Sequence, residues 1–395
     1  MHSPLRPLTI LSPLAPYPPL SGGTAHMLRV TQQLAQRYQV SFVALAPAPE
    51  QVEWGPLAAQ CASVRAFRRT QRSKWGFNPP AARQEHSAEL LAYLRRAWAA
   101  QPPAIVQLEY TSMAQYARPA RAAGALVACT AIELAFRTQV RRARQERDAR
   151  LKARRWLGAL SLWRYELATL PQCDLVITLS EPDALALRRW LPRLTVEYIP
   201  SGIDLAEWPV CRTPRAGAQV LFVGNYLHPP NVDGALWLAR EVWPLVRLAH
   251  PGARLTLAGR DPPAAIQALA APDIHIPGAV ADMRPLYAQA TLVAAPIFWG
   301  SGVRIKLIEA LACGLPVVTT ALAAEGIDLR HAQSVLFAEQ PAGFADAIVR
   351  LLADPVLRER LGAAGRTLIE RDYDAALVGA RLGALYERRL ALRGA

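Results

Sequence analysis

Short runs of β-branched and other apolar residues recur along the chain, and longer stretches with a helical repeat of apolar positions separate them. In the N-terminal half the runs are at 8–12, 40–45, 105–109, 125–129 and 175–179. In the C-terminal half they are at 220–223, 254–258, 274–276, 292–295 and 316–319. Strands that alternate with helices are typical of parallel sheets built from βαβ units. The pattern therefore predicts an α/β fold with one doubly wound, Rossmann-like domain in each half.

The stretch 200–217 interrupts this rhythm, because it is rich in Pro, Gly, Arg and Ala and has little periodicity. We expect an N-terminal domain at 1–205, a linker at 206–217 and a C-terminal domain at 218–375. A final helix at 376–395 can pack back on the N-terminal domain. Since ligands of open α/β sheets bind beyond the carboxyl ends of the strands, we expect the two domains to face each other across a cleft.

Composition fits two packed domains rather than a disordered chain. The 395 residues are 52% hydrophobic and 19% charged, which is far from the signature of disorder. The five cysteines are scattered and none is spaced as C-x-x-C, so neither a disulfide framework nor a zinc site is expected. Prolines interrupt the apolar N-terminus, and no run is long enough to span a membrane. We expect a cytoplasmic protein, or one at the inner face of the cytoplasmic membrane.

The formal net charge of +14 raises the question of nucleic acid, since basic surfaces bind phosphate polymers. Arginine supplies 42 of the 45 basic residues throughout the chain, a skew typical of coding bias, so no nucleic-acid partner is expected. The segment 137–155 is helical in pattern and holds nine basic residues against Glu146 and Asp148, and Trp156 and Leu157 follow it. Such a segment either contacts an anionic membrane surface or is a solvated helix face.

The most informative stretch is 298–320, where a glycine loop lies between a predicted strand and a predicted helix. Backbone N–H groups and the helix dipole favour an anion at such a place. Arg304 and Lys306 add positive charge where cations are unfavourable for the helix itself, so we expect an anionic ligand to compensate them. Glu309 lies two turns into the helix, where its carboxylate either accepts hydrogen bonds from ribose hydroxyls or pairs with Lys306. Gly314 is expected to end the helix.

These motifs carry a resemblance to a known family. GSGVRIKLIEALACGLPVV at 300–318, VGNYLHPPNVDGALWLAREVWPLV at 223–246 and PGAVADMRPLYAQATLVAAP at 277–296 are similar to retaining glycosyltransferase family 4 with the GT-B fold. The resemblance is to the branch that transfers sugars in exopolysaccharide and cell-envelope synthesis. PYPPLSGGTAHMLRVTQQLAQRYQVSFVAL at 16–45 is similar to that family's first strand, glycine loop and helix.

The resemblance implies roles for individual residues. Glu309 would bind the donor ribose, and Arg304 and Lys306 would stabilise the leaving diphosphate as the catalytic pair. The loop of Gly300, Ser301, Gly302 and Val303 would supply backbone donors near the phosphates or the sugar. Gly22 and Gly23 would let the N-terminal loop approach the donor phosphates, because glycine tolerates unusual φ angles, unless they form an ordinary turn.

Other polar residues are candidates from their positions alone. Asn225 and His228 follow the first strand of the C-terminal half and either face the cleft or cap the next helix. His26, in the first helix, is a candidate on the acceptor side. Asp282 is placed to cap the helix that follows it. Asp372-Tyr373-Asp374 spells a D-x-D pattern beyond the last predicted strand, where no metal is expected.

Two positions depart from the family's pattern. Members commonly carry two glutamates eight positions apart, and the first of the pair falls on Ser301. A His-Asp pair that commonly follows the fourth strand is replaced by Thr130-Ala131, ahead of Ile132-Glu133. Thr130 and Glu133 are therefore the acceptor-side candidates at that place.

The favoured interpretation is a metal-independent glycosyltransferase that needs no cofactor. It would move a sugar from a nucleotide diphosphate sugar to a saccharide or lipid-linked saccharide. The resemblance to the family implies that anomeric configuration is retained. Because of the two departures, a catalytically weakened subunit that binds nucleotide sugar for a partner transferase stays open. A sugar-nucleotide epimerase lacks motif support. A dinucleotide oxidoreductase is disfavoured because no G-x-G-x-x-G follows a predicted strand.

Overall fold

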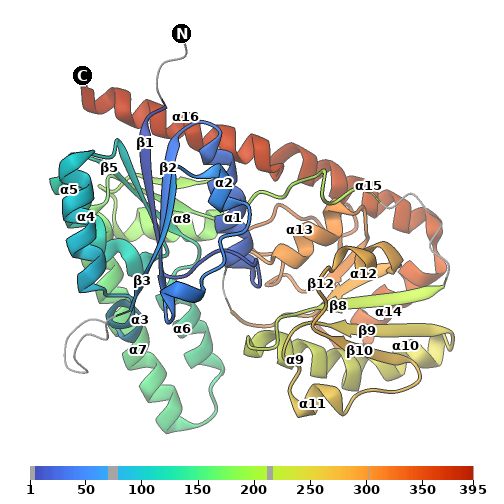
Figure 1. The fold of residues 1–395 in the computed structure, drawn as a ribbon. Coiled ribbons are helices and arrows are strands. Elements are labelled where there is room, and N and C mark those ends of the chain that lie inside the picture. The colour runs from blue at the N-terminus through green and yellow to red at the C-terminus, as the bar shows by residue number, and fades with distance from the viewer. Residues whose placement is uncertain (1–4, 70–78, 211–216, 301, 395) are drawn as a thin grey trace. The chain divides into compact units, whose positions relative to one another are not determined.

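The computed structural model describes residues 5–69, 79–210, 217–300 and 302–394 (Figure 1). The chain forms two compact units. The first unit is Met1–Gly202 together with Ala375–Ala395, and the second unit is Ile203–Asp374. Each unit is built on its own parallel sheet flanked by helices, which confirms the predicted α/β fold with two Rossmann-like sheets.

The first unit has a seven-stranded sheet in the order β3-β2-β1-β4-β5-β6-β7, and all of its strand pairs are parallel. The strands are β1 Pro7–Ser12, β2 Gln39–Ala46, β3 Ser63–Arg68, β4 Ile105–Glu109, β5 Leu126–Ala131, β6 Leu175–Thr178 and β7 Val196–Tyr198. Every residue of β4 and β5 is buried, as expected for central strands covered on both faces.

Helices cover the two faces of this sheet. On one face, α1 (Gly22–Ala35), α2 (Leu57–Gln60) and α16 (Ala375–Gly394) pack with Leu8 and Ile10 of β1. On the other face, α4 (Ala88–Ala100), α5 (Ala117–Ala122) and α8 (Glu181–Trp190) pack with Leu11. The remaining helices are α3 Pro80–Gln84, α6 Ala135–Gln145 and α7 Ala149–Thr169. Side chains of β1 therefore alternate between two separate apolar layers.

The second unit has a six-stranded parallel sheet in the order β10-β9-β8-β11-β12-β13. Its strands are β8 Ala218–Val223, β9 Ala253–Ala258, β10 Ile274–Gly278, β11 Leu292–Ala295, β12 Val317–Thr319 and β13 Leu336–Phe337. Its helices are α9 Pro229–Trp237, α10 Trp243–Ala249, α11 Ala264–Gln267, α12 Arg284–Gln289, α13 Ile305–Ala312, α14 Pro341–Ala353 and α15 Pro355–Asp372. A short π-helical turn, Leu238–Val242, joins α9 to α10.

Three of the described strands were not predicted from the sequence. They are β3, β7 and β13, each at a sheet edge, and they are short or carry exposed polar residues. Trp208 lies in the predicted linker but is buried in the core of the second unit, where its ring meets that of Tyr287 edge to face at 5.3 Å. Residues 211–216 of that linker lie outside the described residues.

The basic segment predicted as one helical pattern is in fact two helices, α6 and α7, that pack against each other. Glu146 ends α6, and the Asp148 carboxylate accepts a hydrogen bond from the Leu151 N–H at 2.8 Å and caps α7. An Asp that precedes a helical turn is a strong start signal, and here it outweighs the continuous helical pattern. Within the described residues, no helix is both long and apolar enough to cross a membrane.

Candidate functional site

The point where the strand order reverses in the second sheet lies between β8 and β11. The chain leaves β8 through a short loop into α9, and it leaves β11 through the loop 296–304 into α13. Open parallel sheets bind ligands beyond the strand ends at such a reversal. The residues that follow these two strands include the predicted donor-binding residues Asn225, Gly300, Gly302, Val303 and Glu309 and the predicted catalytic pair Arg304 and Lys306. The fold thus brings both sequence segments to one edge of the sheet.

Backbone geometry explains two glycines of the loop after β11. Gly300 has a φ of 106° and Gly302 a φ of 78°, a region that residues with a Cβ rarely adopt. The Thr319 hydroxyl donates to the Ala295 carbonyl at 2.9 Å and so fastens the start of the loop to the end of β12. On the other side, a Cβ on Gly234 of α9 would lie 2.3 Å from the Pro296 carbonyl oxygen. The predicted donor residue Ser301 lies outside the described residues.

Helix α13 begins at Ile305, with Arg304 in the N-cap position. The Arg304 guanidinium donates to the Gly302 carbonyl, so the arginine folds over the glycine loop. At the other end, Gly314 has a φ of 67°, its N–H donates to Leu311, and the Leu315 N–H donates to Ala310. These two bonds form a Schellman motif, which confirms Gly314 as the residue that ends the helix.

Lys306 lies in the first turn of α13 and reaches across to α9. Its ammonium group donates to Asn231 Oδ1 at 2.7 Å and lies 4.9 Å from the centre of the Phe222 ring. Burial of the ammonium, together with the charge of Arg304, lowers the pKa of Lys306 to about 7, and Glu309 opposes this shift. The site thus concentrates positive charge that a neighbouring anion would stabilise.

Glu309 lies one turn beyond Lys306 on α13. Its Oε2 accepts a hydrogen bond of 3.0 Å from the hydroxyl of Tyr287, a fully buried residue of α12. The same hydroxyl lies 3.3 Å from the Lys306 carbonyl oxygen. Burial is the main cause, and the charge of Glu309 the second, that holds the pKa of Tyr287 well above its usual range. Tyr287 therefore fixes the orientation of the Glu309 carboxylate.

The loop after β8 is shaped by its own side chains. Asn225 Oδ1 accepts from the Leu227 N–H at 3.0 Å, and the Asn225 carbonyl accepts from Asn231 Nδ2 at 2.7 Å. His228 is the N-cap residue of α9, but its exposed side chain makes no capping bond. Val303 packs partly buried against the core. Asn225 thus supports Asn231, whose side-chain oxygen in turn accepts from Lys306.

In the first unit, Gly22 and Gly23 form the first turn of α1 behind Ser21, which caps the helix with Thr24. Neither glycine has a positive φ, so the expectation that unusual φ angles explain them is wrong. Close approach explains Gly23, because a Cβ there would lie 2.1 Å from the hydroxyl oxygen of Tyr110. Tyr110 directly follows β4 and has a φ of 68°, which is rare for a residue with a side chain.

The first acceptor-side candidate, His26 of α1, is only 3% exposed. Its Nδ1 lies 3.1 Å from the Ser201 hydroxyl oxygen, and its Nε2 is buried and has no hydrogen-bond partner among the described residues. Burial, and to a smaller extent the charge of Arg29, lowers the pKa of His26 to about 3. The imidazole is therefore neutral at physiological pH, and it lies below the surface in this structure.

The other acceptor-side candidates lie at the end of β5. Thr130 is buried, and its hydroxyl oxygen lies 3.4 Å from Gln107 Nε2. Gln107 in turn accepts from the Tyr386 hydroxyl of α16 at 2.7 Å and donates to Glu109. Burial raises the pKa of Glu109 to about 7. Thr130 thus belongs to a buried polar cluster, whereas Glu133 lies beyond β5 and accepts from the Thr138 hydroxyl at 3.2 Å.

Two remaining predictions concern carboxylates. Asp282 was expected to cap a helix, but the N-cap of α12 is Met283. Asp282 instead accepts from the Arg284 N–H at 2.9 Å, and this bonding to Arg284 lowers its pKa. Asp372 pairs with Arg371. Among the described residues, no group of three or more His, Cys, Asp or Glu side chains is arranged to hold a metal ion.

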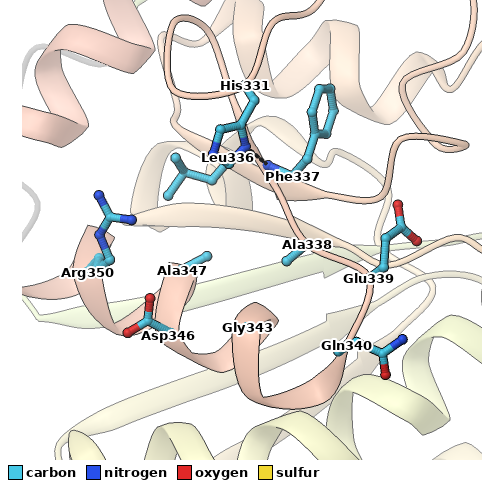
Figure 2. Close-up of a pocket in the computed structure, with 10 residues that line it drawn as sticks. All are labelled: His331, Leu336, Phe337, Ala338, Glu339, Gln340, Gly343, Asp346, Ala347 and Arg350. Atoms are coloured by element: carbon cyan, nitrogen blue, oxygen red, sulfur yellow. Dashed lines mark hydrogen bonds between the residues drawn. The ribbon is translucent and has the colours of Figure 1, made fainter.

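A separate cavity of about 360 Å³ lies beside β13 and the start of α14 (Figure 2). Its lining includes His331, Glu339, Asp346 and Arg350. His331 Nδ1 accepts from the Phe337 N–H at 2.9 Å, and Glu339 accepts from the Ala321 N–H at 2.8 Å. None of the predicted donor residues lines this cavity.

Three residues of the site were missed from the sequence, namely Asn231, Tyr287 and Phe222. Asn231 and Phe222 are 75 and 84 positions from Lys306 along the chain, and no spacing rule links them to it. The signal that points to Asn231 is its place in the first turn of a helix after the first strand of the domain, where ligands commonly bind.

Two known families match the chain. Residues 20–207 match the family described as Glycosyltransferase Family 4, and residues 217–354 match the family described as Glycosyl transferases group 1. The two matches fall on successive parts of the chain, and the second includes all of β8 to α13.

Curated relatives include a glycosyltransferase. The chain is 32% identical over 200 residues to a phosphatidyl-myo-inositol mannosyltransferase of Mycobacterium leprae, a match that covers 48% of this chain and 52% of the relative. It is 25% identical over 210 residues to an uncharacterized 44.6 kDa protein in the cps region of Klebsiella pneumoniae, covering 51% and 52%. The chain thus spans about half the length of the curated relatives it matches.

Solved structures share the fold over nearly the whole chain, and two examples follow. Sucrose-phosphate synthase of Thermosynechococcus elongatus superimposes with a TM-score of 0.73 at 20% identity, covering 98% of this chain and 100% of that one. HepE of Anabaena in complex with UDP and glucose superimposes with a TM-score of 0.69 at 14% identity, covering 96% and 99%. At these identities the likeness establishes the GT-B fold alone.

Proposed function

Since the chain belongs to the glycosyltransferases that join a Family 4 part to a group 1 part, we propose that it transfers a sugar from a nucleotide diphosphate sugar to a saccharide or lipid-linked saccharide. The second unit binds the donor at the β8/β11 strand ends, and the first unit serves the acceptor. We place the reaction in exopolysaccharide or cell-envelope glycan synthesis, because similar proteins include a phosphatidyl-myo-inositol mannosyltransferase and a protein of a cps region.

The observation that carries the proposal is the pair of cations at the start of α13 beside a fixed carboxylate. Arg304 folds over the glycine loop, Lys306 is held by Asn231, and Glu309 is held by Tyr287. A nucleoside diphosphate presents two phosphates and a ribose diol in sequence. Its phosphates match the cations and the helix N-terminus, and its ribose hydroxyls match the carboxylate.

The chemical step follows from these charges. The bond between the anomeric carbon and the β-phosphate oxygen breaks, and its electron pair leaves with the nucleoside diphosphate. Arg304, Lys306 and the α13 N-terminus stabilise the negative charge that develops on the leaving oxygen. The acceptor hydroxyl oxygen bonds to the anomeric carbon and its proton passes to a phosphate oxygen. In our proposal this attack is on the face that the phosphate leaves, so configuration is retained. Because Arg304, Lys306 and the α13 N-terminus stabilise the leaving group, the proposed step needs no metal.

A turnover assay tests the proposed activity. The purified full chain is incubated with UDP- and GDP-sugars in the presence of saccharide acceptors, and release of UDP or GDP is followed. We expect release from one donor class, and a loss of at least about a hundredfold in Arg304→Ala, since one such charge stabilises a transition state by several kcal/mol. Proton NMR of the glycoside then reads its configuration, and an inverted product would contradict the retaining step.

A second candidate is a nucleotide-sugar-binding subunit that does not catalyse transfer. The burial of His26, together with the departures at Ser301 and Thr130, favours it. Donor binding without release of nucleoside diphosphate, for every acceptor and with EDTA or divalent metal added, would support this candidate over the transferase.

A further inference from the structure

Helix α7 has two apolar faces, although only one packs against the protein. On the inner face, Ala159 and Tyr165 are buried and Leu162 packs against the core of the first unit. The outer face carries Trp156, Leu157, Leu160 and Trp163, which are 42, 69, 51 and 37% exposed. These positions recur at helical spacing, so the outer face is a continuous stripe, and we refer to these four residues as the α7 stripe.

Positive charge surrounds this stripe. Arg150, Lys152, Arg154 and Arg164 are exposed on α7, and no ion pair is found for them within the described parts of the chain. The only acidic residue of α7 is Glu166, which lies inside the fold, where it accepts from the Thr111 hydroxyl at 2.7 Å. The packed partner α6 contains four arginines and no acid, and of these Arg137 is paired with Asp183 of α8. The helix thus presents an apolar stripe within a cationic rim.

The hairpin of α6 and α7 holds the stripe outward. Figure 1 shows the joined ends of the two helices extending away from the sheet of the first unit. Ala143 of α6 is buried, and Arg155 of α7 bonds to the Glu146 carboxylate at 2.8 Å. These contacts fix the hairpin without covering the stripe.

We propose that the α7 stripe seats in the interfacial region of an anionic lipid bilayer, with the cationic rim at the lipid headgroups. Exposed Trp and Leu enter the headgroup and acyl boundary, while Lys and Arg pair with anionic lipids. A second copy of this chain is the weaker occupant. A symmetric dimer through the stripe would bring two cationic rims together, and like charges across an interface are repulsive.

This inference does not depend on the proposed transferase activity, because vesicle binding is read without turnover. The purified full chain is floated with phosphatidylcholine vesicles and with vesicles that contain about 30% phosphatidylglycerol, at low and high salt. We expect binding to the anionic vesicles alone, weakened at least tenfold as salt rises from about 0.1 to about 0.5 M. Equal binding to neutral vesicles, or none to either, would overturn the proposal.

Two matched pairs of variants test the stripe and its rim. Leu157→Glu with Leu160→Glu should weaken flotation at least tenfold, whereas Leu245→Glu with Leu248→Glu, exposed leucines at the same spacing on α10, should not. Charge reversal of the rim by Arg150→Glu, Lys152→Glu and Arg154→Glu together should abolish binding. Reversal of exposed arginines elsewhere, by Arg240→Glu, Arg254→Glu and Arg388→Glu together, should reduce binding far less. The far-ultraviolet circular dichroism spectrum and the Tm of each variant report that it is folded.

Light scattering separates the lipid from a second copy. If the wild type is a dimer, and Leu157→Glu with Leu160→Glu is a monomer that still floats with vesicles like the wild type, the stripe is a protein interface and the membrane proposal is wrong.

Discussion

Lys306 shows how one residue's surroundings set its chemistry. Its ammonium lies beside Arg304, over the Phe222 ring and 2.7 Å from Asn231 Oδ1, and its pKa is lowered to about 7. A bound diphosphate favours the charged form and raises this pKa. At a pH between the pKa of Lys306 in the unbound protein and its higher pKa in the bound protein, the bound protein holds a proton that the unbound protein lacks. Binding and protonation are therefore linked.

The first prediction is proton uptake on donor binding. Near pH 8, titration calorimetry with a nucleotide sugar in buffers of different ionisation enthalpy should show up to one proton taken up, and near pH 6 it should show almost none. Affinity should be constant below about pH 7 and fall as the pH rises above it, by at most about tenfold per unit. Lys306→Arg, which keeps its charge, should bind without the uptake. The same uptake in that variant would show that another group takes the proton.

The second prediction concerns the tyrosine that positions Glu309. Tyr287→Phe keeps the buried ring but removes the hydrogen bond of 3.0 Å to the carboxylate. Hydrogen bonds to charged groups contribute about 1.5 kcal/mol or more, so nucleotide affinity should fall about tenfold. Tyr386→Phe is the matched control, because its buried hydroxyl also bonds a side chain but lies in the first unit. Unchanged affinity in Tyr287→Phe would mean that Glu309 does not need this support.

At the scale of elements, helix ends decide where the site residues lie. Gly314 adopts a left-handed conformation that completes the Schellman motif of α13. Gly314→Ala should cost about 1–2 kcal/mol and lower the Tm by about 2–8 °C for a unit of this size. Gly343→Ala in α14 is the control, since a Cβ there meets nothing within 4 Å. It should leave the Tm unchanged or slightly higher, and an equal drop in both variants would contradict the reason given for Gly314.

A polar cluster joins β4, β5 and α16, and it predicts a pH dependence of stability. The pKa of Glu109 is about 7 in the folded protein, above its pKa in the unfolded chain. The protonated carboxyl therefore contributes to the free energy of unfolding below about pH 4.5, and this contribution is lost as the pH rises towards 7. The loss is on the order of 3 kcal/mol. The Tm of the wild type relative to Glu109→Gln should therefore fall between pH 5 and 8. Parallel curves for the two proteins would show that Glu109 does not titrate in this range.

At the scale of the whole molecule, long-range packing is what the sequence did not reveal. All ten predicted strands lie in the two sheets, because buried parallel strands are apolar runs that can be recognised locally. The edge strands β3, β7 and β13 were missed because they are short or carry exposed polar residues. The edge strand β10 is also half-exposed, but the isoleucines at 274 and 276 made it recognisable. The glycine loop and its helix were also predicted correctly. Asn231 and Tyr287 were not, since only the fold brings them to Lys306 and Glu309.

The most direct test of the account is calorimetric titration with UDP and GDP of the wild type, Glu309→Ala, Lys306→Ala and Asp346→Ala. Asp346 lines the cavity beside β13 and is exposed, so it controls both for loss of a carboxylate and for binding at that cavity. We predict micromolar binding of one nucleotide that is lost in the first two variants and kept in Asp346→Ala. Binding that survives in both α13 variants, or that is lost in Asp346→Ala alone, would contradict a donor site at the start of α13.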